Sequence, residues 1–353
     1  MNLSCGIVGL PNVGKSTLFN ALLSRQVADA ANYPFCTIEP NTGIVEVPDG
    51  RLKKLAKISN SKQIIPSAIK FVDIAGLVKG ASKGEGLGNK FLSHIKEVDL
   101  VVHILRFFED TNIARAGSET PQKDYDIIVT ELCLADLATL EKQKEPKGIA
   151  DKELKAKWEV VKEIRTELGK GIPARNTDLT KEEIKSIKDL NLITLKKEIV
   201  VLNVSENDLF RKDEIVEKYS QWNPIIVSAK VEEDLIGLSD DEKKEYLKEL
   251  EIKSSGLEKL IKEAHKTLGL IDFLTTGEKE TRAWTIKKGA KAPEAAGTIH
   301  TDFQKGFIRA AVIDFDDFVE YGDWKALKEA GKVRFEGKDY EMKEGDIVEF
   351  YHN

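Results

Sequence analysis

Eight residues near the N-terminus have the types and the spacing that a phosphate-binding loop requires. They read Gly9-Leu10-Pro11-Asn12-Val13-Gly14-Lys15-Ser16 and match the pattern G-x-x-x-x-G-K-[ST] at every fixed position. Glycines let the backbone fold tightly round an anion, amides at the start of the following helix point at it, and the lysine adds positive charge. We therefore predict a nucleoside triphosphate site whose binding residues are Asn12, Val13, Gly14, Lys15, Ser16 and Thr17, with Lys15 also catalytic.

A second motif, Asp73-Ile74-Ala75-Gly76, follows about 60 residues later, at the end of an apolar segment that reads as a strand. In this D-x-x-G pattern the aspartate holds Mg²⁺ through water and the glycine amide meets the γ-phosphate, so Gly76 joins Lys15 as a predicted catalytic residue. Thr37, between the two motifs, would complete the metal shell when the γ-phosphate is present; the alternative is an ordinary turn or strand residue. The predicted Mg²⁺ ligands are Ser16, Thr37 and Asp73.

The position that orients the attacking water in Ras-type enzymes is occupied here by Leu77. Leucine cannot orient water, so either another group does so or hydrolysis is slow until a partner supplies one. The segment 79–88 that follows is glycine-rich and reads as a mobile second switch or as a flexible linker. Arg115 is either a transition-state cation supplied in cis or a surface arginine, and we favour the surface interpretation.

A later strand, Glu198 to Leu202, ends in Asn203-Val204-Ser205-Glu206, where GTPases carry N-K-x-D. Glutamate is one methylene longer than the aspartate that accepts two hydrogen bonds from guanine, so the pattern argues against strong selection for guanine. The strand Ile225 to Val227 ends in Ser228-Ala229-Lys230, which resembles the last purine-binding loop of such proteins. We predict that the base is held by Asn203, Glu206, Ser228, Ala229 and Lys230; the alternative is polar strand ends without a ligand.

These residues need strands and helices to position them, and the patterns supply both. Residues 3–8 read as a strand and residues 17–23 as a helix, which is the required context for the phosphate loop. Between residues 111 and 197, apolar residues recur at helical spacing, and Thr180-Lys181-Glu182-Glu183 is a capping-box pattern. From residue 274, short apolar runs between glycines predict a small mixed sheet with a short helix. We expect His94 on a helix surface and His103 in a strand or the core.

Composition narrows the class of protein. The 353 residues carry 54 basic and 60 acidic side chains, a net charge of −6, which argues against a uniformly basic surface for nucleic acid. The three cysteines are far apart and form no CxxC pair, which fits a reducing compartment. No apolar stretch is long enough to span a membrane, and the first residues do not resemble a signal peptide. We predict a cytoplasmic protein without a membrane partner.

Taken together, the motifs resemble those of the YchF and Obg-like ATPase family, whose members are translation-factor-related P-loop proteins. The N-terminal resemblance lies in the residues 9–16, 32–37 (Asn-Tyr-Pro-Phe-Cys-Thr) and 73–77. The C-terminal resemblance, to the TGS domain of that family, lies in Thr281-Arg282-Ala283-Trp284, in the residues 295–303 and in Lys305-Gly306-Phe307-Ile308-Arg309. It covers nearly the whole chain. Family members often carry a histidine near position 115, and this chain has Arg115 there, so a role of that family histidine does not carry over to this chain.

The resemblance implies three domains and an α/β fold. A P-loop nucleotide-binding domain with a mostly parallel sheet would comprise residues 1–112 and 198–273, an inserted, coiled-coil-like helical domain residues 113–197, and an α+β, ubiquitin-like TGS domain residues 274–353. The segment 140–198 holds 15 basic and 12 acidic residues, which is either a ribosome-facing surface or an ordinary solvated helix face. The acidic C-terminal domain is expected to be a non-catalytic module for an RNA or protein partner.

The function that the residues and the resemblance predict together is a Mg²⁺-dependent ATP hydrolase that acts as a switch. The resemblance implies that ATP is preferred over GTP and that the partner is the ribosome, most plausibly its large subunit. K⁺ beside the phosphates, held by Asn12, is an additional prediction; otherwise Asn12 is simply a loop residue. Two alternatives stay open: a GTPase of ribosome biogenesis, and a ribosome- or protein-binding adaptor that nucleotide controls with little turnover.

Overall fold

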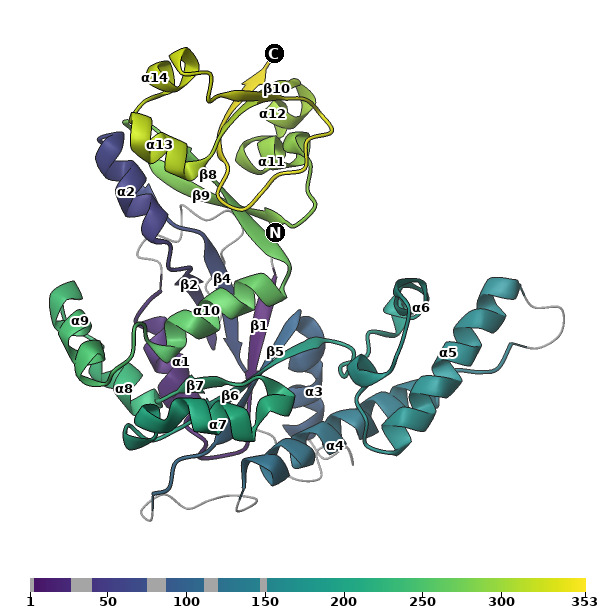
Figure 1. The fold of residues 1–353 in the computed structure, drawn as a ribbon. Coiled ribbons are helices and arrows are strands. Elements are labelled where there is room, and N and C mark those ends of the chain that lie inside the picture. Colours follow the sequence, from purple (N-terminus) through teal and green to yellow (C-terminus); the bar gives the residue numbers. More distant parts are fainter. Residues whose placement is uncertain (1–2, 27–39, 75–86, 111–119, 147–150) are drawn as a thin grey trace.

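A computed structural model describes residues 3–26, 40–74, 87–110, 120–146 and 151–353. Within these residues the chain forms two six-stranded sheets and a helical arm that projects from the side of the first sheet (Figure 1). The predicted Thr37, Gly76, Leu77 and Arg115 lie outside the described residues.

The first sheet has the strand order β2-β4-β1-β5-β6-β7, and every neighbouring pair is parallel except β2 with β4. Its strands β1 and β5 are buried along their whole length because helices cover both faces of a parallel sheet. Its core is made with helices α1, α3, α4 and α10. The mostly parallel α/β fold is thereby confirmed. The elements are β1 (Ser4–Val8), α1 (Lys15–Leu23), β2 (Thr42–Glu46), β4 (Ala68–Asp73), α3 (Leu87–Glu97), β5 (Leu100–Arg106), β6 (Lys197–Asn203), α7 (Lys212–Lys218), β7 (Ile225–Val227), α8 (Ala229–Asp234), α9 (Asp240–Glu249) and α10 (Gly256–Thr267).

The helical arm joins β5 to β6. It comprises α4 (Pro121–Leu140), α5 (Lys152–Gly169) and α6 (Lys181–Ser186). Helix α4 has two partners: Ile128 and Leu132 pack into the core of the first sheet, whereas Val129 and Cys133 pack with α5. The predicted capping box opens α6, because the hydroxyl of Thr180 accepts from the Glu183 amide at 3.3 Å while the Glu183 carboxylate accepts from the Thr180 amide at 2.8 Å.

The second sheet has the strand order β11-β10-β12-β8-β9-β3 and is mixed, as predicted. Helix α11 covers one face around Phe273 and Val312, and α13 and α14 cover the other around Ile313 and Ile347. The sequence pattern indicated one short helix here; the structure has four. The elements are β8 (Leu270–Thr276), β9 (Thr281–Lys287), α11 (Ala292–Ile299), α12 (Thr301–Lys305), β10 (Phe307–Ile313), α13 (Phe315–Tyr321), α14 (Trp324–Glu329), β11 (Arg334–Glu336) and β12 (Ile347–His352).

One segment of the N-terminal part of the chain belongs to the second sheet. Between β2 and β4, the chain forms α2 (Gly50–Ile58) and β3 (Ile64–Ile65). Leu52 and Leu55 of α2 lie in the core with Ile313 and Phe318, and β3 pairs in parallel with β9 at the sheet edge. We call the residues 50–65 the excursion.

The junction between the sheets is also polar. Asp272 of β8 is buried; it accepts a hydrogen bond from the Ser67 hydroxyl at 2.6 Å and lies 3.1 Å from Nε2 of His265. The expected division between residues 273 and 274 falls inside β8, which begins at Leu270. The sequence offers no break there, because α10 ends only three residues earlier, at Thr267, and β8 follows after a single glycine turn.

Candidate functional site

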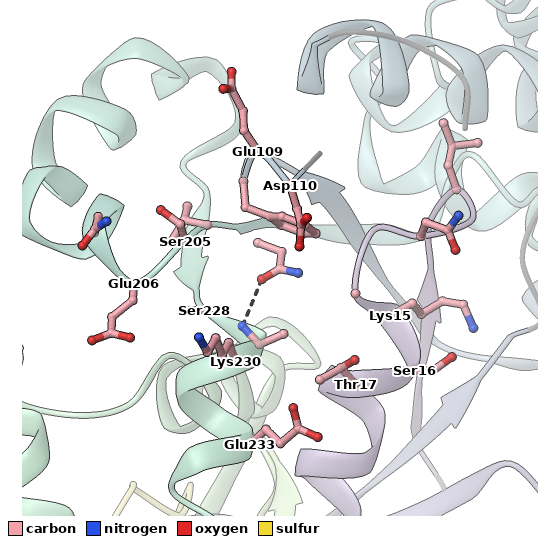
Figure 2. A pocket seen from close by; sticks show the side chains of 18 of the residues that line it. Lys15, Ser16, Thr17, Glu109, Asp110, Ser205, Glu206, Ser228, Lys230 and Glu233 are labelled. Atoms are coloured by element: carbon pink, nitrogen blue, oxygen red, sulfur yellow. Dashed lines mark hydrogen bonds between the residues drawn. The ribbon is translucent and has the colours of Figure 1, made fainter. Parts of the chain in front are cut away.

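Most of the predicted site residues that the structure describes meet at the carboxyl-terminal edge of the first sheet, but Val13 and Asp73 do not line the cavity there. A cavity of about 960 Å³ lies there, beyond the ends of β1, β5, β6 and β7. Ligands of open parallel sheets bind at this edge because the loops that follow the strands converge on it. Figure 2 shows Lys15 and Ser16 on one side of the cavity and Glu206 and Lys230 on the other. The lining residues are Leu10, Pro11, Asn12, Gly14, Lys15, Ser16, Thr17, Phe108, Glu109, Asp110, Asn203, Val204, Ser205, Glu206, Asn207, Ser228, Ala229, Lys230 and Glu233.

The phosphate loop has a backbone that only its own glycines permit. Gly14 has a φ of +90°, and a Cβ atom there would lie 2.1 Å from Nδ2 of Asn203. A Cβ atom at Gly9 would lie 2.8 Å from the carbonyl oxygen of Ile104. Helix α1 begins at Lys15, and its first residues, Lys15, Ser16 and Thr17, line the cavity, so the amides of its first turn lie where an anion could accept from them.

Lys15, Ser16 and Asp73 occupy the part of the site where the metal was predicted. The Lys15 ammonium forms an ion pair with the carboxylate of Asp73, which β4 places beside β1 at the register position of Ile7. The hydroxyl of Ser16 and the carboxylate of Asp73 are hard oxygen donors, which suit Mg²⁺. Among the residues that the structure describes, no cluster of three or more His, Cys, Asp or Glu side chains forms a separate metal site. Ser16 and Asp73 are thus oxygen donors of the kind that Mg²⁺ takes in proteins.

Asn203 joins the phosphate loop to the loop after β7, on the side of the cavity where base binding is predicted. Its side chain is buried; Nδ2 donates to the carbonyl of Val13 at 2.8 Å, and Oδ1 accepts from the amide of Ala229 at 3.0 Å, the dashed line of Figure 2. These two bonds cross from β6 to loops that follow β1 and β7. The structure thus gives Asn203 two backbone partners, and its contact with the purine stays a prediction.

Three residues on the far side of the cavity bear on the base binding predicted there. The hydroxyl of Ser228 is buried in the cavity wall and has no hydrogen-bond partner among the residues that the structure describes, so a ligand could bond to it. Glu206 is half-buried at the start of a short 3-10 helix, η5 (Asn207–Arg211). Val204, at the lysine position of N-K-x-D, is buried in the core beside Leu202 and Leu209.

The sequence patterns missed a third wall of the cavity, which follows β5. The guanidinium of buried Arg106 donates to the carbonyls of Phe108 at 3.3 Å and Asp110 at 3.1 Å and lies 4.4 Å above the ring of Phe108. The amides of Phe107 and Phe108 both donate to the carbonyl of Asn203. The signal was present in the apolar run that ends at Arg106, because the end of a central parallel strand faces the ligand edge. The missed lining residues are Phe108, Glu109, Asp110, Ser205, Asn207 and Glu233.

Both histidines considered from the sequence lie where they were expected. His94 is exposed on α3, and His103 is fully buried in β5. Nδ1 of His103 lies 3.2 Å from the Glu198 carboxylate, which also accepts from Arg175 at 2.6 Å. Burial opposes ionisation of Glu198, but His103 and Arg175 outweigh it and hold the pKa of Glu198 below its usual range. This network joins the helical arm to the first sheet and takes no part in the cavity.

Comparison with known proteins identifies the family of this chain. Residues 4–131 match the family described as 50S ribosome-binding GTPase, and residues 270–353 match the YchF-type GTPase C-terminal family, described as a protein of unknown function. The chain is 47% identical to the ribosome-binding ATPase YchF of Bacillus subtilis over 366 aligned residues that span all of both chains. It belongs to the YchF family. The ribosome-binding ATPase YchF of Escherichia coli O157:H7 is 48% identical, again over the whole of both chains.

The fold agrees with this assignment. The solved structure of the Schizosaccharomyces pombe YchF GTPase is similar, with a TM-score of 0.86 and 39% identity over 99% of this chain and 98% of that one. Among the helices of the described residues, none combines the length and the apolar character that crossing a membrane requires.

Proposed function

We propose that this YchF-family protein binds ATP with Mg²⁺, hydrolyses it, and uses the bound nucleotide to control its association with the ribosome. The observation that supports the nucleotide preference is the composition of the base-binding wall. A phosphate loop and an Asn-x-x-Glu loop face each other across one cavity, and Val204 and Glu206 replace the lysine and aspartate of N-K-x-D.

Both replacements favour adenine. Adenine offers a single exocyclic amino group to the Glu206 carboxylate, whereas guanine presents two neighbouring donors that a shorter aspartate accepts together. The buried Val204 is unable to lie over the base with a charged stem as a lysine does. The hydroxyl of Ser228, which has no partner among the described residues, would add one further polar contact at the same wall. Relatives carry the name ribosome-binding ATPase, which agrees with this choice.

In the proposed reaction the protein contributes position and charge. Lys15 and the first amides of α1 would hold the β- and γ-phosphates, with Gly76 supplying a further amide to the γ-phosphate. Mg²⁺, when bound by Ser16, Thr37 and Asp73, would neutralise charge on the phosphate oxygens. Asn12 would hold K⁺ at the same loop. Because Leu77 stands where Ras-type enzymes carry glutamine, unstimulated turnover is expected to be slow.

The ribosome, most plausibly its large subunit, is proposed as the partner because curated relatives are named for ribosome binding. The protein carries a net charge of −6, so contact with RNA must use a local surface. The helical arm, which projects from the first sheet, is the candidate, and the C-terminal region 274–353, proposed to be a TGS domain, is a second contact for RNA or protein (Figure 1). This role places the protein in the cytoplasm.

Competitive binding of ATP and GTP with Mg²⁺, followed by turnover with and without ribosomes, tests the proposal. ATP should bind at least tenfold tighter than GTP, and ribosomes should accelerate hydrolysis. Lys15→Ala should abolish nucleotide binding, whereas Lys54→Ala, an exposed lysine of α2, should not.

The description of the matching N-terminal family as a GTPase supports a second candidate, a GTPase of ribosome biogenesis. Tenfold tighter binding of GTP would select it. Ribosome binding that survives Lys15→Ala undiminished, without measurable turnover, would instead select the adaptor.

A further inference from the structure

The base-binding wall is held in shape by an acid that does not line the cavity. Asp208 is buried behind the loop 203–207, and its Oδ2 accepts from both the amide of Ser205, at 3.1 Å, and the hydroxyl of Ser205, at 2.6 Å. The amide of Asp208 donates in return to the Ser205 hydroxyl at 3.3 Å. This reciprocal arrangement has the hydrogen-bond pattern of a capping box, one residue before Glu206, the N-cap of η5.

Two consequences follow for the loop. First, Ser205 lines the cavity, yet Asp208 already accepts hydrogen bonds from both its amide and its hydroxyl. Ser205 therefore has no donor left for the base edge. Second, the backbone of Glu206 is held in one conformation, because it lies between Ser205 and Asp208, which are hydrogen-bonded to each other. Glu206 is thus the remaining charged group that this loop presents to the base.

Asp208 is kept ionised at its position. Burial opposes ionisation, but the hydrogen bonds from Ser205 and Arg211 outweigh it and hold the pKa of Asp208 below its usual range. The Arg211 guanidinium donates through Nε to Oδ1 of Asp208 at 2.9 Å, on the side of the carboxylate that faces away from Ser205. The negative charge of ionised Asp208 strengthens both hydrogen bonds to Ser205, because charge-assisted hydrogen bonds are the stronger class.

We propose that Asp208 is a positioning residue for purine recognition, which acts by locking the Ser205–Glu206 backbone so that the Glu206 carboxylate meets the base. This inference rests on the proposed function for the nucleotide site, for the contact between Glu206 and the base, and for the identity of the purine. Asp208 contributes to the affinity for the base and not to the affinity for the phosphates, which are proposed to bind on the opposite side of the cavity, beside Lys15.

Calorimetric titrations of ATP, GTP and inorganic triphosphate, each with Mg²⁺, test the proposal on the full chain. Asp208→Asn keeps the shape of the side chain and removes its charge. The Kd for ATP should rise about tenfold, equivalent to about 1.4 kcal/mol, and the Kd for inorganic triphosphate should stay within twofold. Asp213→Asn is the matched control, because Asp213 is exposed on α7 and five residues away.

Two outcomes would overturn the proposal: an unchanged Kd for ATP, or an equal rise for ATP and triphosphate, which would mark a general effect on folding. Should Asp208→Asn fail to fold, Ser205→Ala removes the hydroxyl side of the same contact, and a roughly threefold rise for ATP alone is then the expected result. If the unmodified protein binds GTP more tightly than ATP, the proposed function fails, while the role of Asp208 is still decided by comparing GTP with triphosphate.

Discussion

Replacement of Asn203 by alanine should damage both ends of the cavity at once. Its side-chain amide donates to the carbonyl of Val13 in the phosphate loop and accepts from the backbone amide of Ala229 at the start of α8. All three residues are buried. Losing the side chain leaves one backbone acceptor and one backbone donor without a partner.

The structure sets the size of the effect. A buried polar group that loses its partner costs about 1–3 kcal/mol, so two such groups lower the free energy of unfolding by about 2–6 kcal/mol. Both groups lie next to an open cavity, and water entering the vacated space should bring the value toward the lower end. A loss of about 2 kcal/mol in preorganisation corresponds to roughly 30-fold in affinity.

Urea unfolding followed by circular dichroism and calorimetric binding of inorganic triphosphate measure the two quantities. Asn20→Ala, an exposed asparagine on α1, is the control and should change neither. The bridging argument is refuted if Asn203→Ala binds triphosphate within twofold of the unmodified protein and loses less than about 0.5 kcal/mol of stability. Triphosphate separates this variant from Asp208→Asn, because only Asn203 is bonded to the phosphate loop.

Three further predictions concern other parts of the chain. Gly14→Ala should weaken triphosphate binding more than about tenfold in the same titration. A residue with a Cβ atom pays about 1–2 kcal/mol to adopt a left-handed backbone conformation, and the new Cβ atom would collide with Asn203. Near-normal affinity would contradict this prediction. Leu55→Ala should lower the free energy of unfolding in urea by about 2–5 kcal/mol, unlike exposed Lys57→Ala, because Leu55 is fully buried between α2 and the second sheet. Burial raises the pKa of Glu232, so the native protein loses stability as the pH rises from about 4.3 through the higher folded value. The stability of Glu232→Gln relative to the unmodified protein should therefore increase between about pH 4 and pH 7. A stability difference that stays constant over this pH range would contradict the prediction.

Local motifs account for what could be predicted from the sequence. The phosphate loop is contiguous, and its glycines are required by its own backbone, so the residues 9–16 identify both the site and the elements that flank it. The end of β6 at Asn203 and the end of β7 before Ser228 were predicted in the same way, since each closes a short apolar run, whereas the start of α8 at Ala229 was not predicted. The structure brings these three segments to one cavity.

Contacts between distant residues account for the rest. The wall formed by Phe108, Glu109 and Asp110 has no motif of its own and depends on Arg106 folding back on it. The Ser205–Asp208 box did have a sequence signal, the pattern S-x-x-D before an apolar residue, but its place behind the cavity depends on tertiary packing. Leu52 and Leu55 have an ordinary amphipathic pattern, which indicates a buried helix face without naming the sheet that covers it.

The excursion has a consequence for how the chain is made. Its partners in the second sheet are synthesised last: Ile65 and Ile347 are separated by roughly 15–60 s of elongation at about 5–20 residues per second. Over that interval the apolar face of α2, with Leu52 and Leu55, has no sheet to cover it. The second sheet in turn lacks its edge strand β3 unless the N-terminal part of the chain is present. The two sheets therefore acquire their full cores together, in one late folding step that joins residues far apart in the chain. Cleaving the chain at any single point between them would not yield two fragments that each bury all of their apolar surface.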